Sequence, residues 1–245
     1  MSNRIRSVFE SRGFSLSPEQ CDRLSLFFDL LVKWNQRMNL TSITDFEEVV
    51  EKHFLDSALL LSPEFSDMQP SLSDVLSVDA IHVMDVGTGA GFPGLVLAIL
   101  RPSWEITLLD SLNKRVEFLH AVISELGLDH VRAIHGRAED LGREDVHRLR
   151  YDLVVSRAVA DTRLLLEICM PFVSDNGIFV SYKGPKFSDE LSLASHAMEE
   201  LRVTHIFDCS FSLGESRRVL VGFRHEGEFP EKYPRRAGIP AKRPL

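Results

Sequence analysis

From residue 81 onward, short apolar runs alternate with longer segments in which apolar residues recur every three or four positions. The runs are typical of buried strands and the longer segments of amphipathic helices, so the alternation predicts a parallel, doubly wound, Rossmann-like α/β sheet. Two closely spaced runs at the end predict an antiparallel edge hairpin. Strands are expected near 81–86, 105–110, 131–135, 152–156, 178–182, 202–209 and 217–224, and helices near 92–101, 113–126, 161–172 and 186–201.

Two amphipathic helices are expected before this sheet. The first begins at Ser17-Pro18-Glu19-Gln20, which has the residue types of a capping box with proline at the first helical position. On the second helix, His53, Asp56 and Ser57 are spaced to touch. The expected buried positions are Leu24, Phe27, Phe28, Leu31, Trp34 and Met38 on the first helix, and Phe46, Val49, Val50, Phe54, Ala58 and Leu61 on the second.

Composition shifts divide the chain into four parts. Residues 62–79 contain five serines, two prolines and three aspartates, which is typical of a linker with at most one helical turn. We therefore expect an N-terminal helical extension at 1–61, the linker at 62–79, a ligand-binding domain at 80–225 and a basic tail at 226–245.

The bulk composition indicates a globular protein of the cytoplasm. The hydrophobic share of 44% is ordinary, no apolar run reaches membrane-spanning length, and the first residues lack the apolar segment of a signal peptide. Cys21, Cys169 and Cys209 are odd in number and far apart, which favours core packing over a disulfide framework or zinc site. The nine histidines show no metal-ligand spacing, so no metal is expected.

The charge is unevenly distributed. The total is −8, but residues 224–245 hold six cationic and three acidic side chains, so this end is +3 and residues 1–223 are −11. A cationic end on an acidic body can guide a polyanion to one edge only.

A glycine-rich turn follows the first strand, from Asp85 to Gly94. Glycines at alternate positions, among them Gly87 and Gly89, let the backbone turn tightly and a ligand approach. The spacing also fits the dinucleotide pattern G-x-G-x-x-G, so a nicotinamide oxidoreductase is one alternative. Asp85 favours S-adenosylmethionine instead, because a carboxylate there repels a pyrophosphate and attracts an ammonium and a sulfonium. Asp110, about 23 residues after Gly87, is placed to bind ribose hydroxyls of either ligand.

In such sheets ligands bind beyond the carboxyl ends of the strands, so the loops there are informative. The loop at 136–140 offers backbone amides and an acid for an adenine. Arg157 follows the fourth strand, and Lys183 and Lys186 follow the fifth. We interpret Arg157 and Lys183 as functional cations on one rim, although a solvated charge is the alternative for each.

Taken in order, these motifs resemble a known family. They are Asp85 through Gly94, Leu109-Asp110-Ser111 with Lys114-Arg115, Arg137-Ala138-Glu139, Val155-Ser156-Arg157-Ala158 and Lys183-Gly184, with Asn39-Leu40-Thr41 and His53-x-x-Asp56-Ser57 upstream and Tyr233-Pro234-Arg235-Arg236-Ala237-Gly238 at the end. The resemblance is to the small-subunit ribosomal RNA methyltransferase G family, also called glucose-inhibited division protein B, and it extends over nearly the whole chain.

The resemblance implies a class I methyltransferase fold, S-adenosylmethionine as cofactor, and methylation of N7 of one guanine in a decoding-region hairpin of 16S ribosomal RNA. It implies cofactor contacts at Gly87, Phe92, Ala138, Glu139 and Arg157, and places Asn39, His53 and Lys183 on the RNA-facing side. Further candidates for contact with the RNA or the small ribosomal subunit are Arg115, Lys186, Arg217, Arg235 and Arg236.

The residues agree with that chemistry. N7 of guanine is an unprotonated acceptor, so it can attack a sulfonium methyl without a general base. Catalysis then depends mainly on alignment of the two reactants. Arg157 and Lys183 would bind O6 of the guanine or RNA phosphates while the base is turned out of its loop. The protein is expected to act as a monomer. A non-catalytic ribosome-binding protein that only senses S-adenosylmethionine is the second alternative.

Overall fold

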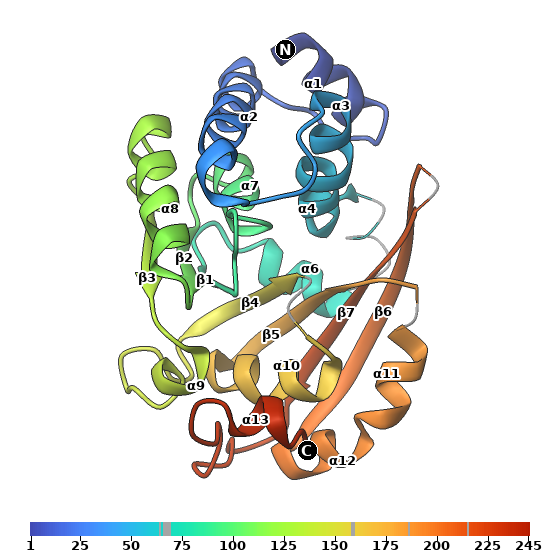
Figure 1. The fold of residues 1–245 in the computed structure, drawn as a ribbon. Helices are drawn as coiled ribbons and strands as arrows, with labels where there is room; N and C mark the ends of the chain where they lie inside the picture. The colour runs from blue at the N-terminus through green and yellow to red at the C-terminus, as the bar shows by residue number, and fades with distance from the viewer. Residues whose placement is uncertain (64, 66–69, 158–159, 186, 215) are drawn as a thin grey trace.

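A computed structural model of the chain describes residues 1–63, 65, 70–157, 160–185, 187–214 and 216–245, and its centre is a seven-stranded sheet (Figure 1). The strand order is β3-β2-β1-β4-β5-β7-β6. The first five strands are parallel, whereas β7 pairs antiparallel with both β5 and β6. The expected doubly wound sheet with an antiparallel edge hairpin is confirmed. The strands are β1 (His82–Val86), β2 (Glu105–Asp110), β3 (Val131–His135), β4 (Tyr151–Arg157), β5 (Val173–Lys183), β6 (Val203–Leu213) and β7 (Ser216–His225).

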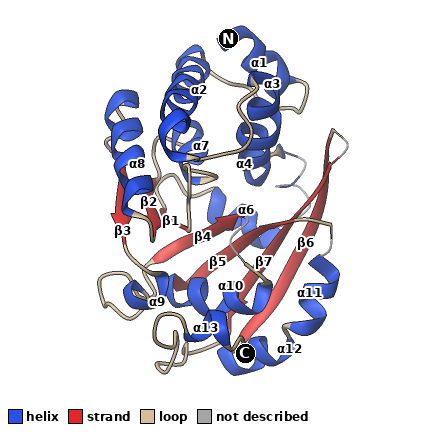
Figure 2. Cartoon of the chain, in the orientation of Figure 1, coloured by secondary structure: helices blue, strands red, loops and turns tan. Residues whose placement is uncertain are grey.

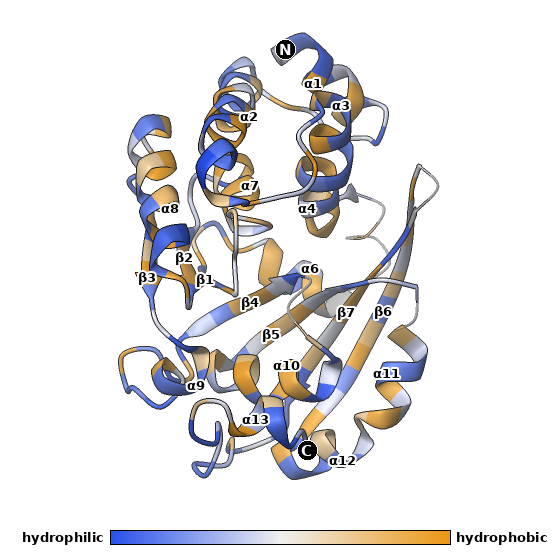
Figure 3. Cartoon of the chain, viewed as in Figure 1, coloured by the Kyte–Doolittle hydropathy of each residue, from blue (hydrophilic) through white to orange (hydrophobic). Residues whose placement is uncertain are grey.

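Helices cover both faces of the sheet, and each face has its own apolar core (Figure 2). One core includes α7 (Gly94–Leu100) and α8 (Asn113–Leu126). The other includes α10 (Thr162–Cys169) and α12 (Ser195–Leu201). Figure 3 shows apolar residues, in orange, in the strands and in these helices. The remaining helices on or beside the sheet are α6 (Pro70–Leu76), α9 (Ala138–Leu141), the 3-10 turn η3 (Met170–Phe172), α11 (Phe187–Leu193) and α13 (Ile239–Lys242).

The N-terminal helices extend the first core. The predicted capping box is present at the start of α2 (Pro18–Met38), where Ser17 Oγ accepts from the Gln20 amide and the Gln20 side chain accepts from the Ser17 amide. Leu24, Phe27 and Leu31 are buried as expected. The other N-terminal helices are α1 (Ser2–Glu10), which the sequence pattern did not predict, α3 (Phe46–Val49), the π-helical turn η1 (Val50–Leu55), α4 (Asp56–Ala58) and the 3-10 turn η2 (Leu59–Leu61).

Two expectations about helices are wrong. The segment 62–79 contains the seven-residue helix α6, more than one turn, because Leu72 is buried in the core. Phe65 in the same segment is also buried, packed edge-on against Phe207 and Phe211. The helix expected at 186–201 is two helices, α11 and α12, with the break at Ala194.

The basic tail is tied to the body by partly buried polar contacts. Arg235 forms a bidentate ion pair with Glu167, which has no exposed surface, through Nε at 2.8 Å and Nη2 at 2.5 Å. The guanidinium of Arg148 donates to the carbonyls of Tyr233 and Pro230. One cation of the tail, Arg235, therefore has a partner inside the protein, and its expected contact with RNA stays a prediction.

No helix in the described residues has the length and apolar composition needed to cross a membrane.

The ion pair leads to a stability prediction. Arg235→Ala should destabilise the protein by about 3 kcal/mol, because it leaves the Glu167 carboxylate buried and unpaired. Arg236→Ala is the matched control, since the neighbouring Arg236 side chain is exposed and its loss should change stability by less than about 0.5 kcal/mol. Chemical denaturation of both variants tests this. Equal stabilities would show that the tail does not stabilise the fold through Arg235.

Candidate active site

The candidate site lies where the strand order reverses between β1 and β4, the usual ligand position in such sheets. The two strand ends are joined there by a buried hydrogen bond, in which Ser156 Oγ donates to the carbonyl of Val86 at 2.8 Å. The glycine loop follows β1, and Arg157 ends β4. The parallel register thus brings together two motifs that are about 70 residues apart in the chain.

The glycines of the loop have two different tasks. Gly89 has φ +61°, and a Cβ there would meet only the Gly87 carbonyl oxygen at 4.0 Å, so this position opens onto space that a ligand can enter. At Gly94 a Cβ would instead lie 2.2 Å from the Leu108 side chain and 2.8 Å from Asp85 Oδ2. Gly89 therefore serves the ligand side of the loop, and Gly94 serves the packing of α7 on the sheet.

Asp85 lies beneath the loop, with no exposed surface. Its Oδ2 accepts from Thr88 Oγ1 at 2.7 Å and from the Gly94 amide at 2.8 Å, which holds both ends of the loop. Among the described residues, Oδ1 has no hydrogen-bond donor. Burial raises the pKa of Asp85 from 3.8 to about 6, although the two hydrogen bonds and the Arg157 charge oppose that shift. Asp85 is thus a buried carboxylate that holds the loop from beneath, and it is not among the residues that line the cavity above the loop.

Asp110, at the end of β2, holds the loop from the other side. Its Oδ2 accepts from the Gly89 amide at 2.9 Å and from Arg115 Nη1 at 3.3 Å, and its Oδ1 accepts from the Leu112 amide. A carboxylate has about four lone-pair positions, so Asp110 retains capacity for a ligand's hydroxyl groups.

We call the space above the loop the glycine-loop cavity. Its volume is about 370 Å³. It contains most of the expected cofactor contacts together with His53 and Arg115. The lining residues are Leu40, Thr41, His53, Gly87, Thr88, Gly89, Ala90, Phe92, Asp110, Ser111, Arg115 and Arg157.

Arg157 forms the wall between this cavity and a second one. Its guanidinium donates to Asp56 Oδ2 at 2.9 Å and lies 5.0 Å from the centre of the Phe92 ring. The His53 ring also stacks on Phe92, with the two ring centres 4.7 Å apart. Arg157 and His53 line both cavities, so a ligand in either space meets the same two side chains.

His53 is held in its neutral form. Burial lowers its pKa from 6.5 to about 4, and the nearby Arg157 charge acts in the same direction. Its Nε2 forms a hydrogen bond of 2.9 Å with Thr41 Oγ1, and the Asn35 side chain holds the backbone of Thr41 through its amide and its carbonyl. The Ser57 hydroxyl donates to the backbone carbonyl of His53.

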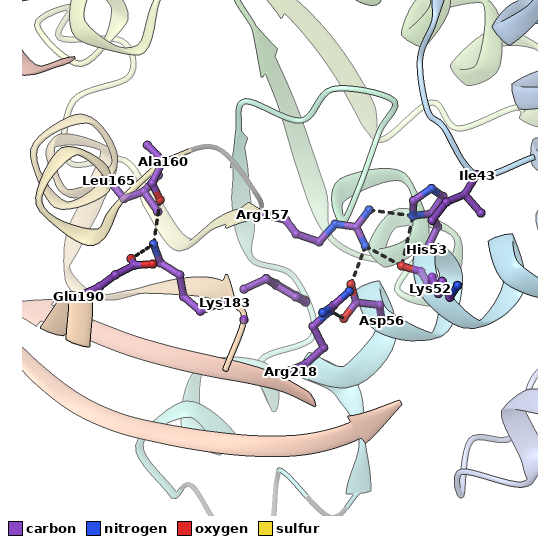
Figure 4. Close-up of a pocket in the computed structure, with 12 residues that line it drawn as sticks. Ile43, Lys52, His53, Asp56, Arg157, Ala160, Leu165, Lys183, Glu190 and Arg218 are labelled. Carbon is purple, nitrogen blue, oxygen red and sulfur yellow. Dashed lines mark hydrogen bonds and ion pairs between the residues drawn. The ribbon is translucent and has the colours of Figure 1, made fainter. Parts of the chain in front are cut away.

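We call the second space the cationic cavity, and its volume is about 400 Å³ (Figure 4). Lys183 enters it from the end of β5, and its Nζ donates to Glu190 Oε2 at 2.7 Å and to the Ala160 carbonyl at 2.8 Å. Arg218 Nε lies 3.3 Å from Asp56 Oδ1. The lining residues are Ile43, Lys52, His53, Asp56, Arg157, Ala160, Leu165, Tyr182, Lys183, Gly184, Glu190 and Arg218.

Several expected contacts lie elsewhere. Ala138 is buried in the core of the α10 face, and Glu139 Oε1 accepts from the Gly238 amide of the tail. Asn39 ends α2 in the left-handed conformation, next to the lining residue Leu40. Arg217 is exposed on β7 and donates to Ser210 Oγ. Lys186, Ala158 and Val159 fall outside the described residues.

Sequence reasoning missed four charged residues of the cationic cavity as functional candidates. They are Lys52, Asp56, Glu190 and Arg218. Asp56 stood in a recognised motif, but only the fold shows that it pairs with Arg157, 101 residues away in the chain. Proximity to Lys183 in the chain was the available signal for Glu190, which follows it by seven residues.

Comparisons with known proteins point to one family over nearly the whole length of the chain. A family model described as rRNA small subunit methyltransferase G matches residues 20–219. A protein of Alkaliphilus metalliredigens with the name Ribosomal RNA small subunit methyltransferase G is 40% identical, over 98% of this chain and 97% of its own. A protein of the same name from Lachnoclostridium phytofermentans is 43% identical, over 96% and 93%.

Among solved structures, TYW2 of M. jannaschii in complex with AdoMet aligns with a TM-score of 0.50 and 15% identity, covering 64% of this chain and 77% of that one. A mutant of MtNAS aligns with a TM-score of 0.50 and 13% identity, covering 92% and 86%. At these identities the likeness concerns the fold.

The raised pKa of Asp85 predicts a pH-dependent contribution to stability. The folded-state value of about 6 lies above the ordinary 3.8, so the buried charge costs stability at neutral pH and the cost fades as the pH falls. Relative to Asp85→Asn, the wild type should gain about 1 kcal/mol of unfolding free energy between pH 7.5 and pH 5.

Denaturant titrations of both proteins at the two pH values measure this difference. Asp129→Asn is the control, because Asp129 is exposed and its variant should follow the wild type. A pH response of Asp85→Asn identical to that of the wild type would contradict the assignment of a buried charge to Asp85.

Proposed function

The chain belongs to the rRNA small subunit methyltransferase G family, and on that premise we propose that it transfers a methyl group from S-adenosylmethionine to N7 of a guanine in a decoding-region loop of 16S ribosomal RNA. Its fold is that of class I methyltransferases. Membership of this family sets aside both alternatives, the nicotinamide oxidoreductase and the non-catalytic sensor. The proposal includes a monomer that acts in the cytoplasm.

One observation carries the proposal, the common wall of the two cavities. A methyl transfer needs a donor site and an acceptor site that meet at one point, and Arg157 and His53 line both spaces. The glycine-loop cavity suits the donor and the cationic cavity suits a nucleotide, since Lys183, Arg218 and Lys52 supply positive charge there.

The residues of the glycine-loop cavity fit S-adenosylmethionine. The open side of Gly89 accommodates close approach of a ligand to the backbone, and Asp110 can accept from ribose hydroxyls. The Phe92 ring offers an apolar surface. Beneath the loop, outside the lining of this cavity, the buried charge of Asp85 favours a cationic ligand. When bound, the cofactor supplies an electrophilic methyl group on a positively charged sulfur.

The chain's own residues then need only bind and align the guanine. N7 carries a lone pair at neutral pH, so no proton has to be removed before it attacks. As far as the structure describes them, the linings of the two cavities contain no cysteine that could activate a pyrimidine carbon. Holding N7 in line with the methyl group can lower the barrier by roughly 7 to 11 kcal/mol.

A transfer experiment tests the proposal. Small ribosomal subunits from cells that lack this activity are incubated with the protein and methyl-labelled S-adenosylmethionine, and the RNA is then digested and analysed by mass spectrometry. The wild type should produce 7-methylguanosine at one position. Gly89→Val should produce none, and calorimetry should show no cofactor binding, because the branched side chain enters the ligand space. Label on any other atom would overturn the reaction that we propose.

A base-free reaction also predicts the behaviour of His53. At saturating cofactor and subunits, His53→Gln should keep its single-turnover rate within about threefold of the wild type, because glutamine retains a polar contact to Thr41 but cannot serve as a base. The wild-type rate should stay flat from about pH 6.5 to 8.5, since burial lowers the pKa of His53 to about 4, well below this range. A loss of about 100-fold or more in His53→Gln would instead assign a proton-transfer role to this histidine.

A further inference from the structure

The cationic cavity contains a donor and an acceptor held side by side. Lys183 Nζ and Glu190 Oε2 are 2.7 Å apart, and the side chains are 6% and 33% exposed. The two residues come from different elements, the end of β5 and the middle of α11, and both line the cavity (Figure 4). The fold therefore presents a fixed pair of opposite hydrogen-bonding character to whatever enters this space.

Both groups keep capacity for a ligand. An ammonium has three N–H donors, and the described partners of Lys183 are the Ala160 carbonyl and Glu190. Within the described part of the chain, the contacts of Glu190 all fall on Oε2, which accepts from Lys183 and from the amide and hydroxyl of Thr162. Its Oε1 therefore keeps its lone pairs for a donor on the ligand.

This arrangement complements the edge of guanine. At neighbouring ring positions guanine carries O6, an acceptor, and N1–H, a donor, whereas adenine carries an N–H₂ donor and an unprotonated N1. With guanine, an ammonium can donate to O6 while the carboxylate beside it accepts from N1–H. With adenine, the ammonium would face the donor N–H₂ group and the carboxylate would face the unprotonated N1, so neither pair could form. We propose that Glu190, paired with Lys183, selects guanine by accepting from N1–H while Lys183 donates to O6, an inference that rests on the function proposed above.

The order of the groups in the site supports this orientation. Along the perimeter of guanine, N7, O6 and N1 follow one another. In the protein, Arg157 pairs in register with Tyr182, so Lys183 lies at the next position on the adjoining strand, and Glu190 follows beyond Lys183. Figure 4 shows Lys183 between Arg157 and Glu190. A guanine that places O6 at Lys183 and N1 at Glu190 turns N7 toward the Arg157 wall, beyond which the glycine-loop cavity lies.

Glu190 also has a structural task, because it receives the amide and hydroxyl of Thr162 at the start of α10. Loss of activity in a variant would therefore not prove base recognition. The preference between guanine and adenine separates the two roles, since a structural defect lowers transfer to both bases by the same factor.

The test uses small subunits reconstituted with 16S RNA that carries guanine, inosine or adenine at the position where the wild type places its methyl group. We expect the wild type to prefer guanine over adenine by about 10⁴-fold in kcat/KM, and inosine, which keeps O6 and N1–H, to be within about tenfold of guanine. In Glu190→Gln the guanine-to-adenine ratio should fall by about 30-fold or more, because an amide can donate to N1 of adenine.

Asp189→Asn is the matched control, because it removes one negative charge from the same helix at an exposed position and should leave the ratio unchanged. Cofactor affinity and melting temperature of Glu190→Gln report whether the fold and the glycine-loop cavity are intact. If the ratio in Glu190→Gln falls by less than about 30-fold, or adenine transfer stays below detection, the inference is overturned. Failure of the wild type to methylate guanine N7 would refute the proposed function instead, and the two failures are thus distinguishable.

Discussion

The buried ion pair between Asp56 and Arg157 is the contact on which the site's geometry depends. It joins the N-terminal helical segment to the end of β4, and its side chains are 2% and 13% exposed. Two charges removed from water cost several kcal/mol unless other groups compensate. Here Arg218 approaches the second carboxylate oxygen of Asp56, and the Phe92 ring faces the guanidinium of Arg157. The N-terminal helices therefore complete the candidate site, because they supply the counter-ion of Arg157.

The helical segment on the N-terminal side of that contact has an unusual geometry. Residues 50–55 form a π-helical turn, a wider form that is rare and is often found at functional sites. His53 lies within this turn, and Asp56 follows it directly. Both side chains reach the wall between the cavities, while Phe54 and Leu55 from the same stretch remain in the core. The turn thus lets one short segment contribute to the core and to the site.

The sequence predicted what depends on local pattern and missed what depends on distant partners. Apolar runs and glycine turns located the strands of the sheet, because strand alternation and turn chemistry act over a few residues. The helix α6 was missed because its composition is that of a linker, and only burial of Leu72 in the core explains it. Charge along the tail suggested Arg235 as an RNA contact, which stays a prediction, but gave no sign of its ion pair with Glu167, 68 residues earlier. Asp56 was overlooked as a candidate for the same reason, because its partner Arg157 lies 101 residues later.

The charges around the wall also bear on how the proposed reaction centre can include an arginine. A sulfonium bound in the glycine-loop cavity would be repelled by the guanidinium of Arg157, and in a site of low polarity this repulsion would be large. Asp56 contacts Arg157 directly, Asp85 lies beneath the loop, and Asp110 lines the cavity. Arg115 and Arg218 share Asp110 and Asp56 with these charges, and burial raises the pKa of Asp85 while the Arg157 charge opposes that shift. A neutral nucleophile such as guanine N7 then suits the site, because it adds no further charge to this cluster.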